Sequence, residues 1–97
     1  MVKYLITYSG MGHPDPAQME AARAAFGEWL ATAGDAVVDP GSPVNYIGAV
    51  AAGTPTAPPE FSGYTIIEAD TEQEVRDILA NHPFVARGGT LQISRSL

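Results

Sequence analysis

Two histidines are the residues of this chain best suited to chemistry at neutral pH. His13 follows a predicted strand and lies next to Asp15 along the chain, so it is a candidate general base or ligand-binding imidazole. The structural alternative is a histidine that only belongs to the loop before a helix. His82 follows a predicted helix, where a partly charged imidazole would stabilise the negative helix end. A place in a pocket is the equal alternative for His82.

Two further side chains complete the candidate site. Arg87 precedes a Gly-Gly pair and could hold a substrate carboxylate, or it could simply form an ion pair with a surface acid. Tyr8 ends a predicted strand and could line a cavity, although tyrosine also suits sheets. We therefore expect a pocket near Tyr8, His13, His82 and Arg87, with the catalytic residues left unassigned. The histidines are too far apart along the chain to carry a metal-ligand spacing, so no metal site is predicted.

The remaining candidate groups favour structural roles. Trp29 belongs to the apolar stripe of a helix, which predicts core packing. Glu68 and Asp70 could act as paired carboxylates, but a solvated strand end is the favoured interpretation. Gly10-Met11-Gly12 lacks the third glycine of a dinucleotide loop, and the chain has no Walker, HExxH or CxxC motif. No cofactor is therefore expected.

The elements that must position these residues begin with an alternating strand at Val2–Tyr8. Asp15 can cap the helix that follows, because its carboxylate can accept from free amides while a proline takes the first helical position. Apolar residues at spacings of three and four predict that this helix spans 16–33, and Gly34 ends it.

The second half of the chain predicts two more strands before the next helix. The expected elements are a turn at 39–43, a strand at 44–51, a stiff proline-rich connection at 54–60, a strand at 61–69, a helix from Thr71 to about Asn81, a loop at 84–89 and a strand at 90–97. The order β-α-β-β-α-β is typical of the ferredoxin-like α+β sandwich, in which two helices cover one face of a four-stranded antiparallel sheet.

The uncovered face of such a sheet needs an explanation. We assign Leu5, Ile47, Ile67 and Ala69 to it, and a face that only meets solvent would not carry this many apolar side chains. The sequence therefore predicts a homodimer whose second subunit closes this face.

Composition limits the alternatives. The chain has 97 residues, no cysteine and a net charge of −6, which predicts one domain over 1–97 without disulfides. Five basic against eleven acidic residues argue against nucleic-acid and anionic-membrane partners. The first apolar run is too short for a leader or a membrane span, so a cytoplasmic protein is expected.

The C-terminal third resembles the YCII-related family (YciI-like and DGPF-motif proteins). The resemblance rests on Gly63–Asp70, on His82-Pro83-Phe84 and on Gly88–Ile93, each in the family's order. It implies a ferredoxin-like dimeric α/β barrel with a cleft between sheet and helices, and one relative in the family is a dehydrochlorinase. The DGPF motif is replaced by TPTAPPEF, and His82 stands where some members have an aspartate. The family's proposed His/Asp pair is therefore not carried over.

Three functions follow as hypotheses. The first is a small-molecule-binding protein with a pocket between sheet and helices, with lyase-like activity as one option. The second is a non-catalytic dimeric interaction or regulatory subunit. The third, a cofactor-free monooxygenase of the dimeric-barrel superfamily, rests on analogy of fold.

Overall fold

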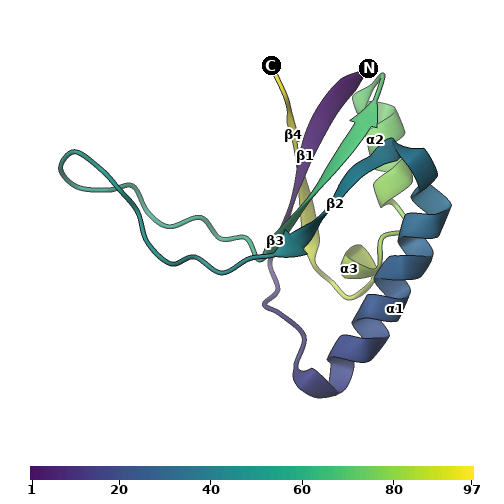
Figure 1. Ribbon diagram of the computed structural model, residues 1–97, viewed down its shortest axis with the longest axis horizontal. Helices are drawn as coiled ribbons and strands as arrows, with labels where there is room; N and C mark the ends of the chain where they lie inside the picture. Colours follow the sequence, from purple (N-terminus) through teal and green to yellow (C-terminus); the bar gives the residue numbers. More distant parts are fainter.

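The computed structural model describes residues 1–97, which form one sheet and a layer of helices (Figure 1). The elements are β1 (Val2–Ser9), α1 (Pro16–Ala33), a short 3-10 turn η1 (Gly34–Ala36), β2 (Val37–Pro43), β3 (Gly63–Ala69), α2 (Glu72–Leu79), α3 (Pro83–Ala86) and β4 (Thr90–Arg95). The strands lie in the order β2-β3-β1-β4, and every neighbouring pair is antiparallel. The predicted ferredoxin-like α+β fold is confirmed, with the helices on one side of the sheet.

Both long helices begin as their cap residues predict. The Asp15 carboxylate accepts from the Gln18 amide at 3.0 Å, and the Thr71 hydroxyl accepts from the Glu74 amide at 3.2 Å. Gly34 ends α1 with a positive φ of 62°, and its amide donates to the Leu30 carbonyl. The bounds of α1 are those predicted.

The prediction of a strand at 44–51 is wrong, because the second strand is β2 at Val37–Pro43. The Asp39-Pro40-Gly41 sequence produces an irregular edge strand where a turn was expected, and the register against β3 shifts there. Gly41 has a φ of 75°, and a Cβ at this position would lie only 1.7 Å from the Tyr64 carbonyl oxygen. The turn residues therefore bend the strand at its contact with β3 without ending it.

Residues 45–60, here called the arm, contain no helix or strand. Figure 1 shows the arm leaving the sheet on the side away from α1 and returning to it. Every residue of the arm is exposed, and Ile47 is 97% exposed. The arm therefore lies outside the packed body of the molecule.

The core lies between the sheet and the helices. Its buried side chains are Tyr4, Ile6, Trp29, Ile67, Ala69, Val75 and Leu79. Ile67 and Ala69 were assigned to the uncovered face, and that assignment is wrong, because β3 directs its odd-numbered residues toward the helices. The opposite side of the sheet, here called the open face, carries Leu5, Thr7, Tyr64 and Ile66, and also the paired positions Lys3 and Glu68 near one end.

Residues 84–89 were predicted as a loop, but Pro83–Ala86 form the short helix α3. His82 is its N-cap residue, and Pro83 takes the first helical position, where a missing amide hydrogen has no cost. This turn brings His82 and Phe84 into the protein interior. None of the helices combines the length and the apolar character needed to span a bilayer.

Candidate functional site

A cavity of about 370 Å³ lies between α1, the irregular part of β2 and α3. This main cavity is lined by all four residues proposed from the sequence: Tyr8, His13, His82 and Arg87. Its volume falls within the range of small-molecule sites, roughly 300–1,000 Å³. The fold therefore brings together two pairs of residues from opposite ends of the sequence, Tyr8 with His13 and His82 with Arg87.

His82 is held by hydrogen bonds at both ring nitrogens. The Phe84 amide donates to Nδ1 at 3.0 Å, so Nδ1 carries no proton. Nε2 lies 2.9 Å from the Tyr8 hydroxyl oxygen, and in the neutral ring Nε2 must be the nitrogen that donates. The cap of α3 thus selects one tautomer of His82.

The hydrogen bonds continue in one direction beyond Tyr8. The Thr65 hydroxyl donates to the Pro40 carbonyl at 2.9 Å, so Thr65 must accept from the Tyr8 hydroxyl at 2.7 Å. The chain runs from His82 to Tyr8, then to Thr65, and ends on the backbone of β2. No proton in it is left without an acceptor.

Aromatic side chains surround the His82 ring, which is 1% exposed. Its centroid lies 4.3 Å from that of Trp29, 5.2 Å from that of Tyr8 and 5.7 Å from that of Phe26. Burial lowers the pKa of His82 to about 4, with a smaller contribution from the positive charge of Arg87. His82 is therefore neutral at pH 7, and of the two alternatives left open for it the structure agrees with the place in a pocket and not with a partly charged imidazole at the end of α2.

The pKa of Tyr8 is also shifted in the direction that makes the side chain less reactive. Burial raises the pKa of its phenol above the usual 10, and the hydrogen bond with Thr65 offsets only part of that effect. Tyr8 stays protonated at neutral pH. Together Tyr8 and His82 form a neutral polar wall of the main cavity.

His13 has a different environment at the exposed rim of the main cavity. Its Nε2 lies 3.2 Å from the Val44 carbonyl oxygen and 2.9 Å from Asn45 Oδ1. Because a carbonyl oxygen can only accept, Nε2 carries the proton. Nδ1 of the neutral ring then holds a free lone pair and makes no hydrogen bond within the chain. The arrangement is that of an oriented base, held by Val44 and Asn45, which follow β2 in the chain.

The charge of the main cavity is opposite to that of the whole chain. Arg23 and Arg87 both line it, and no aspartate or glutamate does. The single ion pair of the structure joins Arg76 and Glu72 on α2, so both cavity arginines are without a carboxylate partner. Arg87 also lies 5.7 Å from the centre of the Phe84 ring, a cation–π contact. The surface ion pair considered for Arg87 is absent.

Arg23 was not identified from the sequence. It lies on the side of α1 that also carries Met19, Ala22 and Phe26, and these three side chains line the main cavity as well. The predicted apolar stripe of this helix included all three, yet Trp29 is the only buried residue of α1. The sequence did contain a signal for Arg23: it lies four residues after Met19 and three before Phe26, and residues at these spacings share a helix face.

Other candidate groups lie elsewhere. Trp29 is 5% exposed and donates from Nε1 to the Ile78 carbonyl at 3.0 Å, which confirms its predicted core position. Glu68 and Asp70 do not line the main cavity. The structure contains no cluster of three or more histidine, cysteine or acidic side chains able to hold a metal ion.

Comparisons with known proteins identify a similar fold among the solved structures. A scan against protein-family models and a search of curated proteins each find no match. Among solved structures, the chain is similar to 5-chloro-2-hydroxyhydroquinone dehydrochlorinase (TftG) from Burkholderia phenoliruptrix AC1100, in complex with 2,5-dihydroxybenzoquinone. The identity is 24%, the match covers 98% of this chain and 93% of that one, and the TM-score is 0.60. The two proteins share the ferredoxin-like α+β fold.

Proposed function

We propose that this protein binds a small anionic aromatic molecule in the main cavity and catalyses a lyase-like elimination on it. One observation carries the proposal: two arginines without carboxylate partners line a cavity that also holds an oriented imidazole and no acidic side chain. A phenolate, hydroxyquinone or carboxylate group would supply the missing negative charge.

The walls suit a flat ring. Phe26, Phe84 and Pro83 give the cavity apolar surface, and the Tyr8–His82 pair adds polar groups that stay neutral. A charged Tyr8 or His82 in these walls would repel a ligand or bind it too tightly. Neutral hydrogen-bonding groups only orient it. The two arginines at the rim then orient the ligand, because its negatively charged end binds next to them.

His13 is the general base in this proposal. Its free Nδ1 accepts a proton from a substrate C–H or O–H bond, and the electron pair of that bond forms a new double bond. The bond to the leaving group breaks, and the group departs with its electrons as an anion, which an arginine stabilises. His82 takes no part as a base, because both of its nitrogens are engaged.

Calorimetry tests the binding step. The probe is 2,5-dihydroxybenzoquinone, an acidic hydroxyquinone, with uncharged hydroquinone as a ligand of similar size. We expect Arg23→Gln and Arg87→Gln each to weaken probe binding at least about tenfold, since a hydrogen bond to a charged group contributes about 1.5–3 kcal/mol. Arg95→Gln is the matched control, because Arg95 is exposed and lies outside the main cavity. Equal binding of both ligands, or no effect of either cavity arginine, contradicts the proposal.

We also propose that the protein is a cytoplasmic homodimer in which a second copy closes the open face. Support comes from the apolar side chains on that face, with Leu5 42% exposed, and from the small number of buried residues, eleven of 97. Light scattering tests it against the 10.2 kDa mass of one chain. The non-catalytic alternative keeps the dimer and the cavity but shows no turnover that depends on His13.

A further inference from the structure

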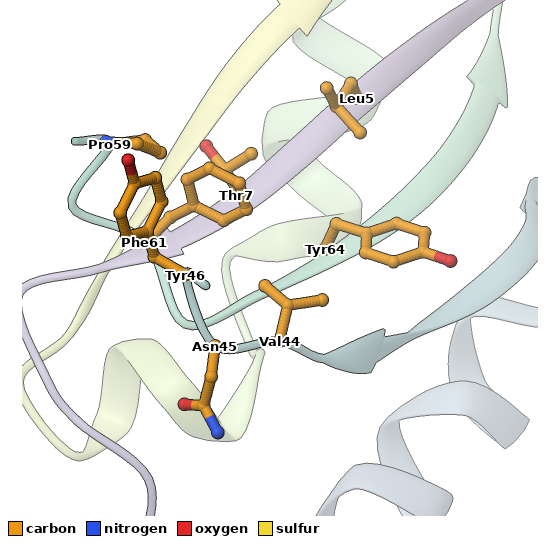
Figure 2. Close-up of a pocket in the computed structure, with 8 residues that line it drawn as sticks. All are labelled: Leu5, Thr7, Val44, Asn45, Tyr46, Pro59, Phe61 and Tyr64. Atoms are coloured by element: carbon orange, nitrogen blue, oxygen red, sulfur yellow. The ribbon is translucent and has the colours of Figure 1, made fainter. Parts of the chain in front are cut away.

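The open face holds a second hollow that is unlike the main cavity. This groove, of about 350 Å³, is lined by Leu5 and Thr7 of β1, by Tyr64 of β3 and by residues at the root of the arm, as Figure 2 shows. None of its lining residues is charged. The groove is therefore suited to apolar side chains and offers nothing for an ionic ligand.

The arm carries the side chains that such a groove would accept. Ile47 and Val50 have almost all of their surface exposed, and neither contacts the body of its own chain. Isolated exposed aliphatic residues are ordinary, but here they lie on a segment that no other part of the chain supports. One protein thus presents both an empty apolar groove and unpartnered apolar side chains.

The shape of the chain indicates that the arm is built to reach another body. The radius of gyration is 14.5 Å, whereas a compact chain of this length has about 12.5 Å. Pro55, Pro58 and Pro59 stiffen the returning limb, and Gly53 turns the tip with a φ of 98°. A stiff arm loses little conformational entropy when it is docked.

Charge favours a second copy of this chain as the partner. Two molecules of net charge −6 repel each other, so a contact between them must use neutral surface. Residues 45–59 contain no charged side chain, and neither does the groove. Stable interfaces use roughly 20–30 residues on each side, and the arm together with the open face supplies a surface of that size. A two-fold axis would pair each arm with the other copy's groove, so that all four surfaces are buried at once.

We propose that the arm of each subunit crosses to the second subunit and places Ile47 and Val50 against that subunit's groove. The inference rests on the proposed homodimer and adds the swapped arm to it. It also connects assembly to the main cavity, because Val44 and Asn45 at the root of the arm are the residues that orient His13. Docking of the arm would hold this root in place.

Disulfide trapping tests the crossing directly, since the natural chain has no cysteine. Ile47→Cys protein is mixed with a longer-tagged Leu5→Cys protein under mild oxidation. We expect a cross-linked heterodimer that a reducing agent separates. The matched control replaces Ile47→Cys with Val85→Cys, an exposed position on α3 outside both the arm and the groove, and it should give no heterodimer.

Sedimentation gives the second measurement. Ile47→Asp should raise the dimer dissociation constant at least about thirtyfold, because it places a charge in an apolar contact. Val85→Asp should leave that constant unchanged. A dimer that neither forms the heterodisulfide nor responds to Ile47→Asp overturns the crossed arm and leaves the homodimer standing. A monomer at all concentrations overturns both.

Discussion

The two histidines line the same cavity, yet the structure gives them opposite properties. His82 is buried among aromatic rings, and both of its nitrogens are engaged in hydrogen bonds. His13 is exposed at the rim, and only its Nε2 is engaged, by a backbone carbonyl and an amide. The first arrangement fixes a neutral ring as part of the wall, whereas the second leaves a lone pair free for a substrate.

The difference teaches that a perturbed pKa does not by itself identify the reactive group. Burial lowers the pKa of His82 to about 4, so a search for perturbed groups would select this residue first. The hydrogen bonds decide otherwise, because a base needs a free nitrogen as well as a suitable pKa. The contrast predicts that His82 variants lose stability and that His13 variants lose chemistry.

Replacing His82 should have the largest effect on stability. His82→Ala removes a ring in contact with three aromatic side chains and also removes the cap of α3. We expect the free energy of unfolding to fall by about 3–4 kcal/mol, as for a buried aromatic residue. Urea denaturation measures it, with His13→Ala as the control expected within about 0.5 kcal/mol. Equal losses in both variants would remove the distinction between the two histidines.

The stability contributed by neutral His82 should disappear in acid. Its pKa is lowered to about 4 in the folded protein, against 6.5 when unfolded, so the unfolded chain binds more protons between these values. The contribution is constant above pH 6.5 and is lost as the pH falls toward 4, by up to about 3 kcal/mol.

Comparison with His82→Gln isolates this effect from the titration of the carboxylates. The stability difference between the natural protein and His82→Gln should shrink as the pH is lowered from 7 to 4. Arg87→Gln should narrow the pH range over which this stability is lost, because loss of the nearby positive charge raises the pKa of His82 in the folded protein. Stability curves that stay parallel over this range would show that His82 is not held neutral by folding.

The sequence predicted the parts of the molecule that depend on local signals. Asp15, Thr71 and Gly34 specify where the helices begin and end, and the structure follows them. The strand order follows from the pattern of elements, because few topologies suit β-α-β-β-α-β in a short chain.

The parts that could not be predicted depend on contacts distant in the sequence. Asp39-Pro40-Gly41 has the composition of a turn, and only its pairing with β3 keeps it in a strand. His82 was expected near a helix end, but its burial depends on Trp29 and Tyr8, more than fifty positions away. The four site residues could be grouped from the sequence. The separate roles of His82, as part of the wall, and of His13, as the proposed base, could be assigned only from their hydrogen bonds.

Tyr8 tests the hydrogen-bonded wall with a smaller change. Tyr8→Phe keeps the ring but removes the acceptor of the His82 Nε2 proton and the donor to Thr65. We expect a loss of about 1–2 kcal/mol, the cost of leaving a buried donor unsatisfied. Tyr46→Phe is the matched control, because Tyr46 is exposed on the arm and should change stability little. An unchanged Tyr8→Phe protein would mean that water replaces the lost hydroxyl.

His13 should show the smallest effect on folding and the clearest effect on chemistry. His13→Gln retains a group that can donate to the Val44 carbonyl but has no lone pair of sufficient basicity. Its stability should stay within about 0.5 kcal/mol of the natural protein. Release of the leaving group in the proposed elimination should fall at least about 100-fold, the usual contribution of a positioned base. Binding of 2,5-dihydroxybenzoquinone should persist, because the arginines are unchanged. Full turnover in His13→Gln would move the base away from the rim of the cavity, and loss of binding without loss of stability would make His13 a ligand contact instead.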